Sequence, residues 1–139
     1  MLYPKKVKHR RKHRGTLKGK ASRGVKLEYG KYGIKAETKG YLSSRQIEAA
    51  RRTIRRHLKK EGKLWIRIFP DKPYTDKGVE VAMGGGKGMV DHYETPIRPG
   101  RVLFEIDGVS EDLAKNALER ASHKLPMKTK FITQEGQLQ

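Results

Sequence analysis

Residues Ser43–Pro73 read SSRQIEAARRTIRRHLKKEGKLWIRIFPDKP and predict a basic helix, a glycine stop, an apolar strand and a proline-bracketed turn. Ser43 is the expected N-cap of the helix, and Gln46 three residues later completes a capping box. Leu42 and Ile47 stand where a hydrophobic staple would form. The start of this helix is therefore well defined by its sequence.

The predicted helix is amphipathic, with a narrow apolar stripe at helical spacing formed by Ile47, Ala50, Ile54 and Leu58. The rest of its surface carries the cations Arg45, Arg51, Arg52, Arg55, Arg56 and Lys59. Like charges four residues apart cost a few tenths of a kcal/mol per pair, and Glu48 and Glu61 are expected to give little relief. A polyanionic partner is thus favoured over the alternative, a solvated basic face.

After the helix, Gly62 is the expected C′ residue, and Lys63–Phe69 alternates as a strand. Leu64, Ile66 and Ile68 share one side of that strand. A helix and a strand this short cannot bury themselves, so they need a sheet from elsewhere in the chain.

The composition indicates one compact domain with an acidic partner. The 139 residues contain 33 Lys/Arg against 15 Asp/Glu, a formal charge of +18. The candidate partners are nucleic acid, an anionic membrane or an acidic protein. The chain has no cysteine, so we expect neither disulfides nor thiolate metal sites. No apolar run reaches the roughly 20 residues that span a bilayer, and the basic N-terminus is not a secretory signal.

Residues 1–24 form a basic arm with ten Lys/Arg, two His and no acid. Alone, such a stretch should be extended or disordered, and its charge density is typical of arms that bind nucleic acid. A solvated solubility tail is the alternative. His9 and His13 have no carboxylate or thiol nearby, so no metal site is expected there.

The remaining elements predict an α+β domain over residues 25–133, with a mixed, mostly antiparallel sheet and two helices. Residues 134–139 are expected to be a frayed tail. The further predicted strands are Val25–Tyr29, Lys31–Glu37, Val79–Met83, His92–Ile97 (ended by Pro96), Arg101–Ile106 as a central strand, and Thr129–Thr133. The second helix follows its N-cap Ser110 and is ended by Pro126.

The chain offers no constellation typical of an enzyme. Gly84–Gly88 is not a nucleotide-binding loop, because Met89 stands where Ser or Thr should follow. It is either a flexible loop or a thin extension that approaches an RNA backbone closely. No acid pair lies in an apolar setting, and His57 and His123 are expected at the surface. We therefore expect no catalytic residues, no cofactor and no metal.

Several composite motifs carry a resemblance from residue 2 to about residue 131. They are L-x-PK…K-x-R-x-x-HRG (Leu2–Gly15), SRQIEAARR (Ser44–Arg52), K-x-WIRIFPDKP (Lys63–Pro73), M-G-x-GKG (Met83–Gly88), PGRVLFEI-x-GV (Pro99–Val109) and HKLP-x-KTKF (His123–Phe131). In these motifs the chain resembles the bacterial L-sixteen family of large-subunit ribosomal proteins, which is shared with archaeal and eukaryotic L-ten-e.

The resemblance implies a hammerhead-like domain and a structural role in the large ribosomal subunit, in a cytoplasmic or organellar ribosome. It implies binding to large-subunit rRNA between the peptidyl-transferase region and the central protuberance. It also implies help in organising the aminoacyl-tRNA (A) site, with contacts to tRNA in the A and P sites. Neighbouring ribosomal proteins are the other implied partners, and no homo-oligomer is expected.

Carried over residue by residue, the resemblance assigns rRNA contacts to the arm and to the first helix. These residues are Lys5, Lys6, Lys8, Arg10, Arg11, Lys12, His13, Arg14, Lys18, Lys20, Arg23, Arg45, Arg51, Arg52, Arg55, Arg56 and Lys59. The tRNA-facing loop would be Met83, Gly84, Gly85, Gly86, Lys87 and Gly88.

The chain departs from the family pattern around that loop. Ala82 stands where the family usually has an arginine that some bacteria hydroxylate, and Gly85 stands where it has a lysine. The strand after the loop is altered as well, at Asp91–Pro96.

A DNA- or general RNA-binding regulator is the alternative function. The predicted order strand–strand–helix–strand lacks a helix-turn-helix, the usual platform for groove reading. An RNA-modifying enzyme would need a cofactor loop or a catalytic dyad, and neither is found in the sequence.

Overall fold

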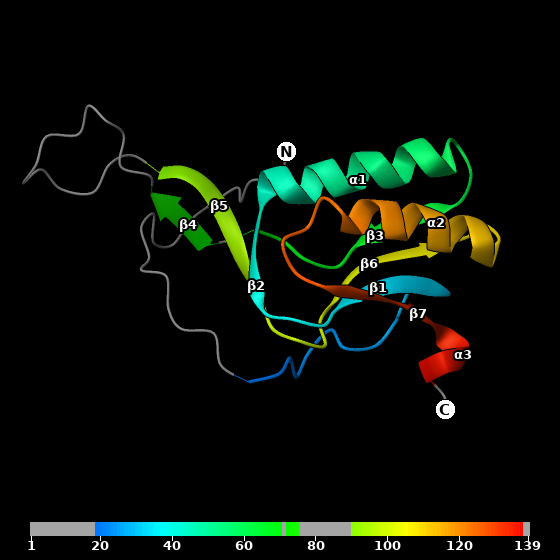
Figure 1. Ribbon diagram of the computed structural model, residues 1–139, viewed down its shortest axis with the longest axis horizontal. Helices are drawn as coiled ribbons and strands as arrows, with labels where there is room; N and C mark the ends of the chain where they lie inside the picture. Colours follow the sequence, from blue (N-terminus) through cyan, green and yellow to red (C-terminus); the bar gives the residue numbers. More distant parts are fainter. Residues whose placement is uncertain (1–18, 71, 76–89, 138–139) are drawn as a thin grey trace, which may run out of the picture.

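The computed structural model describes residues 19–70, 72–75 and 90–137 (Figure 1). The arm cations up to Lys18, the predicted strand Val79–Met83 and the loop Met83–Gly88 lie outside these residues. The described elements confirm the predicted α+β class, with two long helices and antiparallel strands.

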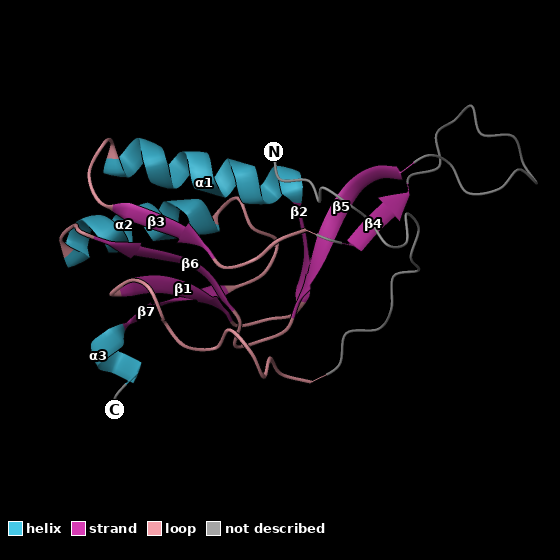
Figure 2. Ribbon diagram, turned by 180° about the vertical axis from the view of Figure 1, so that it is seen from behind, coloured by secondary structure: helices cyan, strands magenta, loops and turns pink. Residues whose placement is uncertain are grey.

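A four-stranded antiparallel sheet forms the centre of the domain, in the order β3-β6-β1-β7. The strands are β1 (Tyr32–Ala36), β3 (Lys63–Ile66), β6 (Val102–Asp107) and β7 (Thr129–Thr133). Strand β6 lies between two neighbours, as its apolar run predicted. Helices α1 (Ser44–Leu58) and α2 (Glu111–Ser122) lie side by side on one face of this sheet (Figures 1 and 2).

A second sheet of three antiparallel strands, in the order β2-β5-β4, stands at one end of the domain. Its strands are β2 (Gly40–Ser43), β4 (Lys72–Thr75) and β5 (Val90–Ile97). The sequence indicated one sheet, whereas the described strands form two.

Two predictions about proline were wrong in this second sheet. Pro73 was expected in a turn but lies in β4, at the edge of the sheet, where a missing N–H costs little. Pro96 was expected to end its strand but pairs with Tyr41 within β5. The described part of β4 pairs with β5 as far as Glu94, so among the described strands Pro96 has a neighbour on one side only.

Helix α1 begins as predicted and ends differently. The Ser43 hydroxyl accepts a hydrogen bond from Gln46 N at 3.2 Å, and Gln46 Oε1 accepts one from Ser43 N at 3.0 Å, which completes the capping box. The predicted apolar stripe is fully buried. Lys59, with φ of 57°, is the C-cap, so Gly62 is not the C′ residue. Gly62 instead lets its backbone pass β6, because a Cβ there would lie 2.7 Å from Asp107 O.

Helix α2 packs against α1 and completes the core. The Ser110 hydroxyl caps it by accepting from Leu113 N at 3.3 Å, as predicted. The helix ends at Ser122, before Pro126, and turn hydrogen bonds continue from Lys124 N and Leu125 N. Its buried residues are Ala114, Ala117, Leu118 and Ala121, and Leu125 packs beyond its end.

The C-terminal end of the described domain consists of strand β7 and a short helix. Strand β7 has the bounds that the sequence predicted. It is followed by a short helix, α3 (Gln134–Gln137), where a frayed tail was expected.

The predicted strand Val25–Tyr29 does not form, because a buried carboxylate takes its backbone donors. Glu105 on β6 is fully buried. Its Oε1 accepts from Glu28 N at 3.0 Å and from Tyr29 N and Gly30 N at 2.9 Å. The segment is thus held by one side chain rather than by a strand ladder. Alternation along β6 puts Glu105 on the face opposite to Phe104 and Ile106, which pack in the helix-covered core.

Arg67 neutralises Glu105 at this anchor. Its Nη1 donates to Glu105 Oε2 and to Lys26 O, and its Nη2 lies 3.6 Å from Glu28 Oε2. The guanidinium carbon lies 5.2 Å from the centroid of the Tyr29 ring. A buried ion pair is stable when its remaining lone pairs and protons are bonded. Here both partners meet that condition, so residues 26–30 are fixed to the sheet.

Candidate nucleic-acid interface

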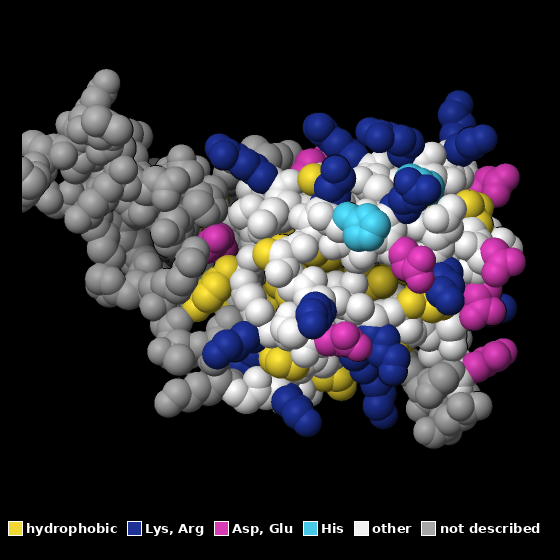
Figure 3. All heavy atoms as spheres, in the orientation of Figure 1, with side chains coloured by type: hydrophobic (Ala, Val, Ile, Leu, Met, Phe, Trp, Pro, Cys, Tyr) yellow, Lys and Arg dark blue, Asp and Glu magenta, His cyan; other side chains and the backbone are white. Residues whose placement is uncertain are grey.

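The outer face of α1 is a cationic surface, which Figure 3 shows as Lys and Arg side chains gathered along the edge formed by this helix. The side chains of Arg45, Arg52, Arg56 and Lys59 are exposed, while Arg51 and Arg55 are half-buried. The cause is helical geometry. The stripe Ile47, Ala50, Ile54 and Leu58 faces the core, so the residues between its members must face outward or sideways.

Glu48 removes one arginine from that surface. Its carboxylate accepts from Arg51 Nη2 at 2.5 Å and from Arg51 Nε at 2.9 Å, and Arg52 Nε lies 3.3 Å away. The hydrogen bond from Arg51 lowers the pKa of Glu48 to about 2. The expectation that Glu48 gives little relief was therefore wrong, since its carboxylate occupies the guanidinium of Arg51.

Glu48 also pairs with Arg52, but the remaining cations of this surface have no carboxylate partner within the described part of the chain. Among the described residues, no carboxylate forms an ion pair with Arg45, Arg55, Arg56 or Lys59. Arg52 and Arg56 are both exposed and stand one turn apart. Glu48 offsets part of their repulsion through Arg52, and a row of phosphates would relieve the rest.

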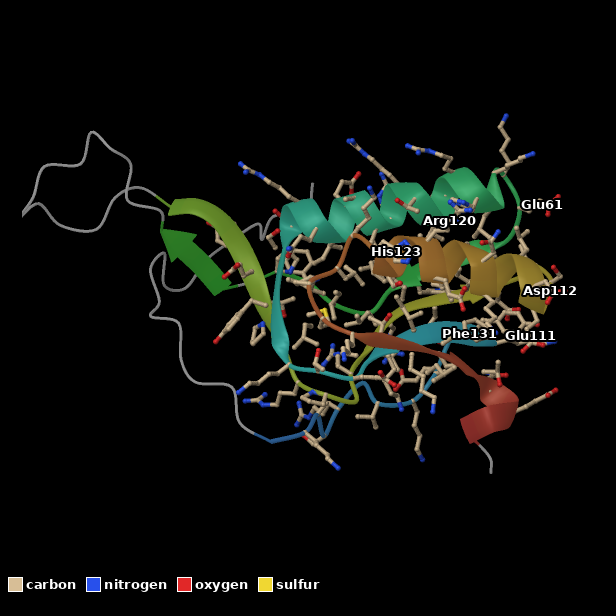
Figure 4. All side chains as sticks on the ribbon, in the orientation of Figure 1. Glu61, Glu111, Asp112, Arg120, His123 and Phe131 are labelled. Atoms are coloured by element: carbon tan, nitrogen blue, oxygen red, sulfur yellow. The ribbon has the colours of Figure 1, made fainter. Side chains whose placement is uncertain are left out.

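Three acids gather at one end of the domain. Figure 4 places Glu61, Glu111 and Asp112 together at the end of the molecule where α1 finishes and α2 begins. Glu111 and Asp112 occupy the first turn of α2, where negative charge suits the helix dipole. A polyanion would therefore meet less repulsion along the outer face of α1 than at this end of the domain.

The described part of the predicted arm lies near the opposite edge of the domain. Lys20 and Arg23 are exposed on the segment before β1. Ala21 N donates to Pro99 O at 2.9 Å, and Val102 N donates to Gly24 O at 2.7 Å, which joins this segment to the β5–β6 connection. Arg23 consequently lies in one group with Arg98 and Arg101.

Arg98 and Arg101 were not among the predicted contacts. Their spacing around Pro99-Gly100 indicated only a turn before a strand. The pairing of residues 21–24 with the β5–β6 connection brings them to Arg23, and this pairing joins parts of the chain more than 70 residues apart. No local signal in the sequence could have shown it.

Within residues 19–70, 72–75 and 90–137, no three His, Cys, Asp or Glu side chains are grouped so that they could hold a metal ion. None of the helices in this described part is both long and apolar enough to cross a membrane.

Comparisons with known proteins match the chain to one family. Residues 4–132 match the family described as ribosomal protein L16p/L10e. The chain is 55% identical over 132 residues to the large ribosomal subunit protein uL16 of Halorhodospira halophila, an alignment that covers 95% of this chain and 96% of that protein. Both findings confirm the resemblance drawn from the motifs.

Proposed function

Because this chain belongs to the ribosomal protein L16p/L10e family and is a structural protein of the large ribosomal subunit, we propose that it docks on large-subunit rRNA through the outer face of α1. The contacts are Arg45, Arg52, Arg55, Arg56 and Lys59, with Arg51 weakened by its bond to Glu48. The role is architectural and involves no catalytic residue.

One observation carries this proposal: Arg45, Arg55 and Arg56, with Lys59 at the end of α1, form no ion pair with a carboxylate among the described residues, although the helix itself is firmly packed. Each phosphate neutralised by a cation releases condensed counterions, which gives strong and salt-dependent binding. A rigid helix backbone also holds these side chains in one row, so binding has to order the side chains but not the backbone.

The basic arm supplies a further rRNA contact in this proposal. Lys20 and Arg23 are its described members, and the arm cations from Lys5 to Lys18 extend it along the RNA. The charge density of residues 1–24 supports this role.

The tRNA contacts complete the proposed function. The loop Met83–Gly88 faces tRNA in the A site and the P site, and the protein helps to organise the A site. This part is supported by the match of the loop to the family motif, while Ala82 and Gly85 change the side chains it offers.

A matched pair of charge reversals tests the α1 contact. The double variant Arg52→Glu/Arg56→Glu should weaken binding to large-subunit rRNA by more than tenfold and lower the log–log salt slope by about 2, close to 0.9 per phosphate. The control Lys115→Glu/Arg120→Glu makes the same charge change on exposed residues of α2. Equal weakening by both variants would show that only net charge matters and would contradict the proposal.

Sedimentation separates a ribosomal protein from a free regulator. The full-length chain should migrate with the large subunit through a high-salt wash. Recovery mainly as free protein, or on DNA, would support the alternative of a general RNA- or DNA-binding regulator instead.

A further inference from the structure

A small cavity of about 200 Å³ lies where residues 21–23 meet the connection between β5 and β6. Its described lining residues are Ala21, Ser22, Arg23, Pro96, Arg98 and Arg101, of which three are arginines and none is acidic. A hollow lined by three cations favours an anion and disfavours a metal ion.

The walls of this cavity are fixed by backbone hydrogen bonds. Residues 21–24 are bonded to Pro99 O and Val102 N on the other side, at 2.9 and 2.7 Å. The β5–β6 connection is held in turn to β1, because Ala36 N donates to Arg101 O and Gly100 N donates to Ala36 O, both at 2.8 Å. The three arginines therefore project from a preformed frame.

Arg101 is the fixed member of the group. Its Nη2 donates to Arg67 O at 2.8 Å. Gly24 lies against the same guanidinium, since a Cβ on Gly24 would be 2.7 Å from Arg101 Nε and 2.9 Å from its Cζ. A side chain at residue 24 would displace the guanidinium, and the φ of +65° at Gly24 also disfavours one.

No carboxylate in the described part of the chain forms an ion pair with this guanidinium. Arg101 Nε is buried and has no hydrogen-bond partner among the described residues. The pKa of Arg101 is lowered, first by burial and then by the like charge of Arg67. The carboxylate of Glu105 is already paired with Arg67, so it does not neutralise Arg101. A partly desolvated cation of this kind gains from a nearby anion.

We propose that this cavity binds one phosphate group of the rRNA backbone, with Arg23, Arg98 and Arg101 as its donors. The inference rests on the proposed function and adds to it a contact on a second edge of the domain. Guanidinium groups bind phosphate oxygens through two parallel N–H donors, which makes arginine better suited than lysine to such a site.

The cavity and the outer face of α1 lie on different edges of the domain. In Figures 1 and 2, α1 runs along one edge of the domain. The segment before β1 lies along the opposite edge, and so does the connection between β5 and β6. Substitutions at two separated sites should combine additively. The domain would then bridge two separate backbone segments of the RNA.

Binding to large-subunit rRNA tests the cavity against the α1 face. Arg98→Gln removes one exposed donor and should weaken binding by about tenfold while lowering the salt slope by about 1. Ser22→Glu places a carboxylate at the rim and should weaken binding at least as much. Lys115→Gln on α2 is the charge-matched control for Arg98→Gln and should change neither value appreciably.

The outcomes separate the two proposals. If Arg52→Glu/Arg56→Glu weakens binding while Arg98→Gln and Ser22→Glu behave like the control, the cavity does not bind phosphate and the proposed function stands. If none of these variants weakens binding, the proposed function fails as well. The melting temperature of each variant shows whether weaker binding results from loss of the fold.

A measurement on the free full-length protein examines the cavity directly. Inorganic phosphate, added at constant ionic strength, should shift the Nε–Hε NMR signal of Arg101, which Arg101→Lys identifies by its absence. Arg98→Gln should reduce that shift. An equal shift on addition of chloride, or a response confined to the arginines of α1, would overturn the proposal.

Discussion

Helices α1 and α2 share one structural task and differ in their outer surfaces. Both start at a serine N-cap, both bury an apolar stripe, and they lie side by side on the same face of the four-stranded sheet. Outside, α1 carries five arginines and one glutamate, whereas α2 carries three acids and two cations. The buried faces of both helices stabilise the fold, whereas their exposed faces differ in charge and therefore in the partner that they favour.

Charged residues suit the helix dipole at both ends of α2 but only at the C-terminal end of α1. In α2, Glu111 and Asp112 stand in the first turn and Arg120 in the last, where each suits the helix dipole. In α1 the first turn has no acid, and Arg45 stands there against the dipole. In the last turn of α1, Arg55 and Arg56 do suit the dipole, but neither they nor Arg45 pair with a carboxylate among the described residues. An external anion would therefore stabilise the charges of α1 more than those of α2.

The largest expected effect is on the free energy of unfolding, and it tests whether the buried faces of α1 and α2 contribute equally to stability. Ile54→Ala in α1 and Leu118→Ala in α2 should each lower the free energy of unfolding by about 2–5 kcal/mol, because both side chains are fully buried. Urea denaturation measures both. Arg52→Ala on the outer face should stay within about 0.5 kcal/mol of the wild type. A near-neutral Ile54→Ala would mean that the stripe does not hold α1.

Removing the caps should have a smaller effect and would sharpen the comparison. Ser43→Ala and Ser110→Ala should each cost about 1 kcal/mol, since each hydroxyl satisfies one backbone donor. Only α1 has the reciprocal bond from Ser43 N to Gln46 Oε1, so Gln46→Ala should cost a few tenths of a kcal/mol more. Chemical denaturation of the single variants measures these costs, and full stability in Ser43→Asn would confirm that capping is the cause. No loss in Ser43→Ala would contradict it.

The smallest effect concerns pH and is specific to α1. The pKa of Glu48 in the folded chain is about 2, below its usual 4.5. Its pairing with Arg51 therefore contributes stability that is complete above pH 4.5 and is lost as the pH falls toward 2. On the helix surface this amounts to less than about 1 kcal/mol. The stability difference between the wild type and Glu48→Gln should shrink between pH 6 and pH 2.5, and a constant difference would contradict the assignment.

Local patterns predicted the elements that depend on neighbouring residues. The capping box at Ser43, the buried stripe ending at Leu58, the N-cap Ser110 and the bounds of β7 all agree with the structure. Helical spacing and capping act over three or four residues, so they are visible in the sequence.

The errors lie where distant residues meet. Residues 25–29 alternate like a strand, but Glu105 takes three backbone donors in residues 28–30. Gly62 resembles a helix terminator, but it is required where the backbone passes Asp107. In each case a contact across the fold decides the local conformation.

By itself, the sequence determined the class of the domain, the two helices with their apolar and charged sides, and the excess of positive charge that favours an acidic partner. These follow from periodicity and net charge, which need no coordinates. Only the tertiary structure decided which cations remain without a counter-charge. Glu105 neutralises Arg67 and Glu48 occupies Arg51, whereas Arg101 is brought beside Arg23 and Arg98 with no acid lining the described cavity. The reason is that ion pairing depends on distances across the fold, and periodicity along the chain does not specify them.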